Sequence, residues 1–573
     1  MSVPNRQIPT VAPPTAVSFR IVSDGNDLGP ALPVMSVVVN REINRIPEAT
    51  IILEDGSLAD QTFRLSESGD FAPGKKIDIE LGYRGTTEPV FTGVVVGQQI
   101  RLRAGRGLLV VRCKDAAYRL TINRRSRYFE DQKDSEALES LLQEAGLEYE
   151  VADTTDVVPD LSQHICTDWD FLVSRAEANG MIVAVTDGKV RVAVPELNAV
   201  PVLRLEYGAN LIDFDAEVDV RGQFAAVESR AWRAAEDETV TEENPPDSPA
   251  AGDYSTAQLA NVHGQDPRRQ YHGGGASPGE LIAWSAATAR FSKLGRVQAT
   301  LSYVGSAVAT PGDTLELASM GSVYDGPAYV SGIRHELSPG RWTTTAQIGL
   351  RPERFTERFA VSAPAAGGLL PATRGLHVAT VVQVHDDPAG EERIQVTLPA
   401  TAPDGAGNWA RLAAAVAGAE TGTVFRPAVG DEVVVGFLHE DPRFPVILGG
   451  LHASGRPSPF PPQEANGVTG YVSRGGHRLY FEEDGDRITV ETKAGDKLVL
   501  AGEDGKITLA DQHGNRLEMA SDGITLESTK DLTLKAAATL RLEGASVELS
   551  ASASASVESG GTLDLRGSLI QLN

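Results

Sequence analysis

Residues 524–550 read ITLESTKDLTLKAAATLRLEGASVELS, and the apolar side chains of this stretch stand in alternating pairs. Successive pairs start at positions 524, 532, 540 and 547, so the pattern repeats every seven or eight residues. Further upstream the same kind of pair starts at 488, 498, 507 and 517, with a spacing of nine or ten residues. Alternation places both apolar side chains of a unit on one face of an extended chain. Each unit is therefore predicted to be a strand of about five residues in a repeat architecture.

One chain cannot enclose a core with two apolar side chains per strand, whereas three chains can. In a three-sided prism each face covers the other two, and winding the chains together leaves no lateral strand edge exposed. We predict that residues 469–573 form a trimeric, intertwined β-helix, or needle. The residues predicted to face its interior are Ile524, Leu526, Leu532, Leu534, Leu540, Leu542, Val547, Leu549, Leu563 and Leu565. The alternative, a single-chain β-solenoid, would show longer coils or a Gly-Gly-x-Gly-x-Asp repeat, and the sequence has neither.

The remaining sequence is predicted to be mainly β, with an α+β first domain. Strand patterns dominate up to residue 362, and a later segment of short strands has a length that suits a five-stranded OB-fold barrel. Segments rich in proline or small residues separate these parts. The predicted boundaries are a first domain at 1–362, a linker at 363–374, an OB-fold domain at 375–452, a linker at 453–468 and the needle at 469–573.

Three helices are predicted inside the first domain, from apolar residues at helical spacing and from capping residues. They lie near 134–146, 167–180 and 278–294. The last has the fullest set of signals, because Ser277 suits the N-cap and Pro278 suits the first helical position. The first domain is therefore predicted to carry helical insertions between its strands.

The charge balance argues against two classes of function. Lys and Arg total 52 against 78 Asp and Glu, which gives a formal net charge of −26. A surface this acidic repels phosphate backbones and anionic head groups, so neither nucleic-acid binding nor a membrane-surface role is expected. The sequence shows neither a signal peptide nor a run of about 18 apolar residues. We expect the chain to fold and assemble in the cytoplasm, with Cys113 and Cys166 as buried free thiols.

Four motifs in the predicted OB-fold domain follow the pattern of a known family in order. They are Arg393–Pro399, Asn408–Leu412, Phe425–Phe437 and Asp441–Gly449. They resemble the VgrG-like spike proteins of contractile injection systems, which are related to the hub and spike of contractile phage tails. The first domain resembles the hub of this family more loosely, through Asp168–Leu172 and Gly332–His335. Its run from Asn44 to Tyr83 is most similar to the spikes of extracellular, phage-tail-like particles.

The resemblance implies a hub of two β-barrels per chain, so that a trimer presents six barrels to a hexameric inner tube. Such a spike caps the tube, joins it to the baseplate and punctures the target envelope when the sheath contracts. The particle is either released to act outside its producer or retained by it. In many relatives a small conical PAAR-type protein sharpens the needle. If that holds here, the seat of this tip protein is at Gly567, Ile570, Leu572 and Asn573.

No catalytic, cofactor-binding or metal-binding residues are predicted. Phage spikes often carry a lysozyme between barrel and needle, but residues 451–470 are too few to hold one. The needle has only His477 and His513, both far from its tip, so no iron site is expected. The sequence shows no catalytic triad and no nucleophile elbow. The alternative function is a phage-tail-like spike with cell-wall or polysaccharide hydrolase activity, which zymography against peptidoglycan would detect.

Overall fold

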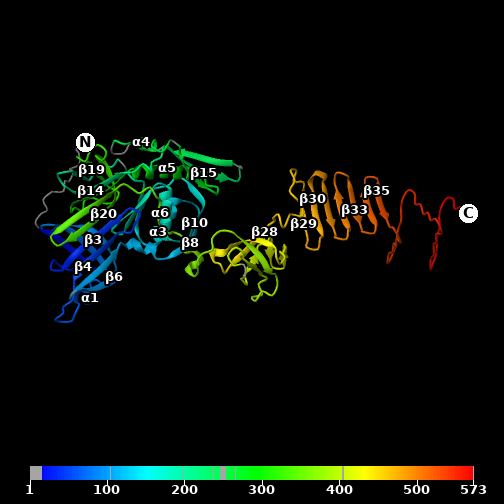
Figure 1. Ribbon diagram of the computed structural model, residues 1–573, viewed down its shortest axis with the longest axis horizontal. Coiled ribbons are helices and arrows are strands. Elements are labelled where there is room, and N and C mark those ends of the chain that lie inside the picture. The colour runs from blue at the N-terminus through cyan, green and yellow to red at the C-terminus, as the bar shows by residue number, and fades with distance from the viewer. Residues whose placement is uncertain are drawn as a thin grey trace. The chain divides into compact units, whose positions relative to one another are not determined.

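The computed structural model describes residues 16–103, 105–196, 198–235, 238–244, 253–264, 266–402 and 405–571. The chain divides into two compact units, Met1–Gly368 and Leu369–Asn573. Figure 1 shows a large sheet with helices in the N-terminal unit, and a small barrel followed by a ladder of short strands in the C-terminal unit. The described part of the chain is mainly β, as predicted.

Thirteen strands of the N-terminal unit form one continuous sheet, in place of two separately closed barrels. Eleven of them follow the order β14 (Leu211–Val218), β18 (Val297–Val304), β21 (Arg341–Ile348), β20 (Gly326–Ser338), β3 (Val34–Glu42), β4 (Glu48–Glu54), β7 (Arg106–Lys114), β6 (Thr86–Arg103), β5 (Lys76–Tyr83), β1 (Val17–Ser23) and β2 (Asn26–Asp27). The other two, β13 (Leu203–Glu206) and β19 (Thr314–Ala318), branch from β20.

The long strand β20 explains why the two halves of this sheet are joined. Its first part pairs with β19, its second part pairs with β3, and β21 runs beside most of it. Each half still buries its own apolar core, one around Ile51 and Ile79 and the other around Leu301 and Leu315. The two predicted barrels therefore correspond to two halves of one sheet, and sequence alone gave no sign of the shared strand.

The predicted helices are present; Thr167 and Ser277 are the N-caps of the second and third, and Lys133 precedes the first. These helices are α2 (Asp134–Glu144), α3 (Asp168–Ala178) and α5 (Pro278–Leu294). The Thr167 hydroxyl accepts a hydrogen bond from the Asp170 amide at 3.0 Å, and Ser277 and Glu280 form a reciprocal capping box. The longest described helix, α5, has 17 residues, and none of the helices in the described ranges combines the length and the apolar character that crossing a bilayer requires.

Smaller elements complete the N-terminal unit around these helices. They are α1 (Arg64–Glu67), α4 (Thr256–Ala260), α6 (Phe355–Arg358), the pair β8 (Arg124–Lys133) and β10 (Val157–Thr167), the sheet of β9 (Glu148–Val151), β11 (Ile182–Thr186) and β12 (Lys189–Ala193), and the sheet of β15 (Val227–Arg233), β16 (Glu238–Asn244) and β17 (Arg268–His272). The Arg175 guanidinium donates two hydrogen bonds to the buried Asp134 carboxylate, at 2.6 and 2.8 Å, and so ties α3 to α2.

Two titratable groups are buried in the large sheet. His335 on β20 is 2% exposed, and its Nδ1 lies 3.0 Å from the Thr344 hydroxyl. Burial, together with the charge of Arg41, lowers the pKa of His335 to about 3, so the imidazole is neutral at pH 7. Burial also raises the pKa of Cys113 to about 12. Both cysteines are free, but Cys166 is only partly buried, because it lies beside an irregular step between β10 and β8.

The OB barrel is the closed barrel of the C-terminal unit. Its strands are β22 (His377–Gln383), β23 (Ile394–Thr397), β24 (Asn408–Leu412), β28 (Pro445–Gly450) and β27 (Glu432–Phe437). Alternate side chains point inward, and Ala379, Val396 and Val433 are among those that fill the core. The barrel thus has the five strands that the sequence predicted.

Seven antiparallel strands follow the barrel and form the needle sheet. They are β29 (Val468–Val472), β30 (Arg478–Glu482), β31 (Arg487–Glu491), β32 (Lys497–Ala501), β33 (Lys506–Ala510), β34 (Arg516–Ala520) and β35 (Gly523–Glu527). Each strand has five residues, as the repeat predicted, and pairs with its neighbours in the same chain. The intertwining predicted for the whole needle is therefore wrong for this part, because the chain folds back on itself at every turn.

Candidate functional site

The needle sheet presents a continuous apolar face built from alternate residues of its strands. In the register of the sheet, apolar residues face apolar residues at every step from β30 to β35. Leu498 stands opposite Leu509, for example, and Leu517 stands opposite Leu526. The pleat of each strand sends these side chains to the same side of the sheet. We call this surface the apolar face.

The side chains of the apolar face stay substantially exposed in a single chain. Leu498 is 39% exposed, and Ile524, in the last strand, is 70% exposed. A contiguous apolar patch of this kind on a folded chain marks an interaction surface, because its exposure to water costs about 25 cal/mol per Å². The apolar face of the needle sheet is therefore a candidate interaction surface.

The opposite face of the needle sheet is suited to water. Glu491 on β31 stands directly opposite Lys497 on β32, with an ion-pair distance of 3.1 Å. Arg516 and Glu527 form a similar cross-strand pair at 2.9 Å. Exposed pairs of this kind contribute about 0.2–1 kcal/mol each, so their main effect is to keep this face soluble.

Turn side chains stack along one edge of the needle sheet. The Gln512 amide donates to the Asp496 carboxylate at 3.1 Å, and the Thr529 amide donates to the Asn515 side-chain oxygen at 2.9 Å. Within one turn, hydrogen bonds from the Asn515 side chain and from backbone amides lower the pKa of Asp511. Asp, Asn and Gly close these hairpins because they tolerate tight turns. Among the described residues, the hydrogen bond of Thr529 with Asn515 is the last of these contacts between neighbouring turns.

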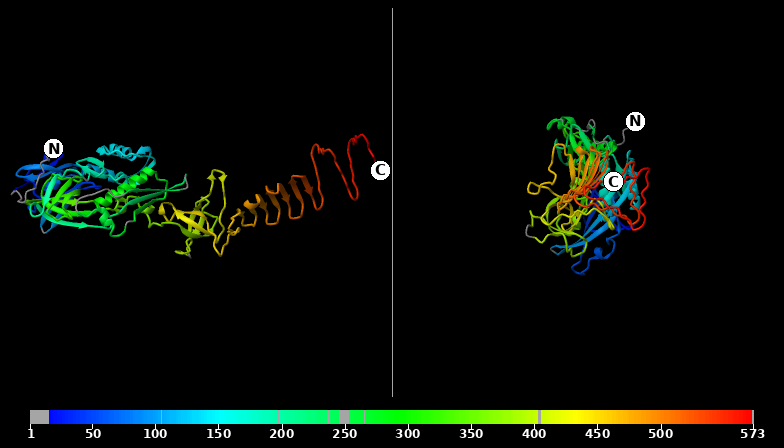
Figure 2. Two further views of the ribbon diagram at one scale, coloured as in Figure 1. Left: turned by 90° about the horizontal axis from the view of Figure 1, so that it is seen from above. Right: turned by 90° about the vertical axis from the view of Figure 1, so that its right-hand side faces the viewer.

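The chain changes character after β35. Residues 528–571 form no strand pairing within the chain, and in Figures 1 and 2 this segment continues as zigzags that lie wider apart than the strands of the needle sheet. We call residues 528–571 the distal segment. Its large apolar side chains are all at least half exposed, up to 82% for Leu549, whereas several on the apolar face are less exposed, such as Leu498 at 39%. Its backbone lacks the sheet hydrogen bonds that its alternating sequence predicts.

The predicted inward-facing residues fall into two groups. Ile524 and Leu526 lie on the apolar face, where β35 brings them opposite Met519 and Leu517. The other eight lie in the distal segment, where no strand of this chain brings them together, and their inward orientation stays a prediction. They are Leu532, Leu534, Leu540, Leu542, Val547, Leu549, Leu563 and Leu565.

The predicted tip seat is only partly within the described residues. Gly567 and Ile570 are exposed, whereas Leu572 and Asn573 lie outside the described residues. Sequence reasoning also missed two members of the apolar face, Leu479 and Phe481, which stand opposite Val490 and Ile488. Their Leu-x-Phe spacing carries the same alternating signal as the later pairs and could have identified them.

In the part of the chain that the structure describes, no three His, Cys, Asp or Glu side chains gather closely enough to hold a metal ion. A cavity in the N-terminal unit is lined mainly by charged and polar side chains. The needle sheet, for its part, offers the apolar face described above.

Two family models match this chain. Residues 13–339 match the family described as the Alg8 N-terminal domain, a description that names no activity. Residues 377–452 match the type VI secretion system/phage-baseplate injector OB domain, which coincides with the OB barrel.

A curated relative and two solved structures are similar to parts of the chain. The type VI secretion system spike protein VgrG3 of Vibrio cholerae is 31% identical over 139 residues, which cover 22% of this chain and 13% of that protein. The 43 kDa tail protein of prophage MuSo2 from Shewanella oneidensis is 12% identical, with a TM-score of 0.43, over 59% of this chain and 99% of that one. The E. coli c3393 protein, a component of the type VI secretion system, is 14% identical, with a TM-score of 0.38, over 75% of this chain and 99% of that one.

Proposed function

Since the chain belongs to the Alg8 N-terminal domain family and is a VgrG-like spike protein of a type VI secretion or phage-tail-like system, we propose that three copies of it form the central spike of a contractile injection machine. The observation that carries this proposal is the needle, which has an uncovered apolar face and a distal segment without internal strand pairing. Two further copies of the same chain would cover the apolar face and supply strand partners for the distal segment.

In the needle sheet, three copies would each supply one side of a prism. The strands of each side already pair within one chain, so only the apolar face remains to be buried. Placing three such faces toward a common axis removes them from water and leaves the charged faces outside. This arrangement gains the hydrophobic free energy without breaking any hydrogen bond of the single chain.

In the distal segment, the strand partners would come from the other two copies. Its repeats are seven or eight residues long, and after Asp531 it has no Asn and few Asp residues to close hairpins of its own. If each repeat steps to the next side of the prism, one repeat of a chain lies beside the following repeat of another chain. Every backbone amide then finds a partner, and no edge is left at the sides.

The remaining assignments of the proposal follow the family. The N-terminal unit would seat on a hexameric inner tube and contact baseplate proteins, and the needle would puncture the target envelope when the sheath contracts. Gly567 and Ile570 would take part in seating a PAAR-type tip protein. Folding and assembly would take place in the cytoplasm. A braided, fully hydrogen-bonded prism supports this use, since puncturing needs axial stiffness.

Engineered cysteine pairs test the change in strand pairing. In the needle sheet, Thr508 and Glu518 are register partners within one chain, so Thr508→Cys/Glu518→Cys is expected to form an intrachain disulfide. In the distal segment, Thr533→Cys/Arg541→Cys is expected to give covalent dimers and trimers, because residue 533 of one copy would lie beside residue 541 of another. Non-reducing denaturing gels of the oxidised full chain distinguish these products.

The chain with only its native Cys113 and Cys166 is the reference for this experiment. A monomeric, internally cross-linked product from the 533/541 pair would contradict pairing between copies. Covalent oligomers from the 508/518 pair would contradict the intrachain register.

We propose a structural role without a catalytic step. The alternative of a spike with hydrolase activity predicts clearing of peptidoglycan in a zymogram by the purified full chain. Clearing by this chain would overturn the structural assignment, whereas an intact substrate layer would support it.

A further inference from the structure

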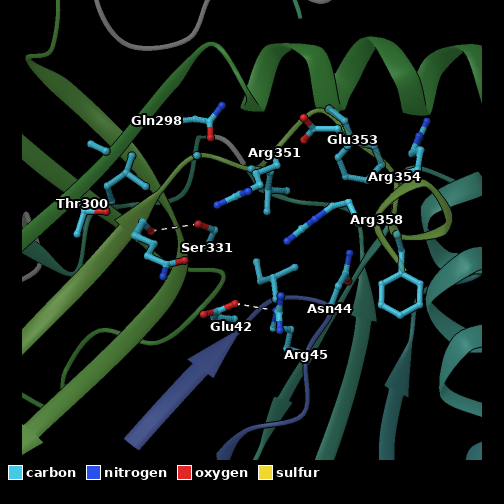
Figure 3. A pocket seen from close by; sticks show the side chains of 18 of the residues that line it. Glu42, Asn44, Arg45, Gln298, Thr300, Ser331, Arg351, Glu353, Arg354 and Arg358 are labelled. Carbon is cyan, nitrogen blue, oxygen red and sulfur yellow. Dashed lines mark hydrogen bonds and ion pairs between the residues drawn. The ribbon is translucent and has the colours of Figure 1, made fainter. Parts of the chain in front are cut away.

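A cavity of about 520 Å³ in the N-terminal unit is lined by side chains from β14, β18 and the segment that includes α6. Figure 3 shows Arg45, Arg351 and Arg358 directed into this cavity. A fourth arginine, Arg354, also lines it. Five carboxylates, of Glu42, Glu177, Asp215, Glu217 and Glu353, line the same cavity, so what distinguishes the four guanidinium groups is which of them the carboxylates contact. We call this cavity the arginine cavity.

Two of these arginines are occupied by the protein itself. Arg354 donates to the Glu177 carbonyl oxygen at 2.8 Å and to the Thr288 hydroxyl at 2.7 Å. Its guanidinium also lies over the Phe291 ring, 4.5 Å from the centroid. Arg45 forms an ion pair with Glu42 at 3.0 Å. These two residues therefore shape the wall of the cavity and leave little donor capacity for a ligand.

The other two, Arg351 and Arg358, form no ion pair within the part of the chain that the structure describes, although the Arg358 guanidinium lies over the Phe359 ring, 5.2 Å from the centroid. Among the described residues, no carboxylate oxygen lies within 4.0 Å of either guanidinium, and neither side chain makes a hydrogen bond. The pKa of Arg358 is lowered by burial and then by the positive charges of Arg351 and Arg45, which outweigh the attraction of Glu353 and Glu42. Like charges are thus held together without a counter-charge in contact.

The acidic residues of the cavity do not fill this role. Glu177 accepts hydrogen bonds from Asn44 and from the Phe355 amide, and Glu42 is paired with Arg45. Glu353 attracts Arg358 from beyond ion-pair distance, and no ion pair joins Asp215 or Glu217 to either arginine within the described residues. The space between Arg351 and Arg358 is therefore open to an anion from outside the chain.

We propose that the arginine cavity binds an oxyanion, a phosphate or carboxylate group, between the guanidinium groups of Arg351 and Arg358. Each guanidinium offers a planar fork of N–H donors that matches two oxygens of such a group. The oxyanion comes either from a free phosphate compound or from an acidic segment of a neighbouring protein in the particle.

Isothermal titration of the full chain at low salt tests this site with two probes, pyrophosphate and a tetraglutamate peptide. At least one probe is expected to bind, and Arg351→Gln/Arg358→Gln is expected to weaken its affinity at least tenfold. Tighter binding of pyrophosphate assigns the site to a free phosphate compound, and tighter binding of the peptide assigns it to an acidic protein segment. The matched control is Arg103→Gln/Arg106→Gln, which removes two exposed arginines outside the cavity and should leave the affinity unchanged.

The melting temperatures of the same variants provide a second, independent measurement. Without an anion, the melting temperature of the double variant is expected to stay close to that of the unaltered chain, because the lost repulsion offsets the lost contact of Arg358 with the Phe359 ring and no hydrogen bond is removed. The probe that binds should raise the melting temperature of the unaltered chain and of the control, but not that of the double variant. If the double variant fails to fold, Arg358→Gln alone serves, since Arg358 is exposed. Absence of binding by both probes, or equal binding by the double variant and the control, would overturn the proposal.

Discussion

Replacement of Leu534 by Asp is expected to abolish assembly of the distal needle while the N-terminal unit and the OB barrel remain folded. In the proposed trimer, Leu534 points toward the axis, so the variant would bring three carboxylates together in a dry interior. Burial of an unpaired carboxylate costs on the order of several kcal/mol per chain, and like charges add to that cost. Hydrogen exchange followed by mass spectrometry should show fast exchange in residues 528–571 and unchanged protection in the N-terminal unit.

The neighbouring substitution Thr533→Asp is the matched control for this prediction. It introduces the same charge one position away, on the face that alternation directs outward. Its distal amides should stay as protected as those of the unaltered chain. Persistence of protected distal amides and intact trimers in the Leu534 variant would show that this side chain does not face the axis.

Acidification is expected to destabilise the N-terminal unit through His335. Its pKa is about 3 in the folded chain, whereas an unfolded histidine titrates near 6.5. Between these values the unfolded chain binds one more proton, so the contribution of this neutral imidazole is fully present above pH 6.5 and is lost as the pH falls toward 3. The free energy of unfolding should fall by up to about 1.4 kcal/mol per pH unit in this window because of this residue.

His335→Gln is expected to lower the number of protons taken up on unfolding by up to one, because an amide does not titrate in this range. The unfolding free energy of the variant should therefore depend less steeply on pH. Denaturant unfolding at several pH values between 7.5 and 4 measures how the free energy of unfolding changes with pH. Tryptophan fluorescence reports mainly on the N-terminal unit, because four of the five tryptophans lie in it and only Trp409 lies outside. The control is His164→Gln, which removes an exposed histidine of the same unit. An unchanged slope in the His335 variant would show that this imidazole is not the acid-sensitive group.

Features set by local chemistry could be predicted from the sequence. The N-cap Ser277, the five-residue needle strands and the five strands of the OB barrel all follow from short-range patterns. Such patterns depend on residues a few positions apart, so no knowledge of the tertiary fold is needed. The resemblance that identified the spike family rested on motifs of the same local kind.

Features set by long-range pairing could not be predicted. The shared strand β20 depends on its pairing with β3, nearly 300 residues away in the sequence. The burial of His335 and the open arginines of the cavity are consequences of that packing, and neither leaves a periodic signal. The end of intrachain pairing at Glu527 is an intermediate case. The repeat there shortens and turn residues become sparse, which is visible in the sequence, but the alternation of apolar residues continues unbroken and by itself predicts one continuous needle.

The measurement that tests the trimeric needle most directly is the mass of the full chain in solution by multi-angle light scattering. One chain has a mass of 60.8 kDa, and we expect a stable species at three times this value that persists on dilution. The Leu534→Asp variant should lose the protected distal needle that holds this species together. A stable species at the mass of one chain, with the apolar face of residues 478–527 still folded, would contradict the account.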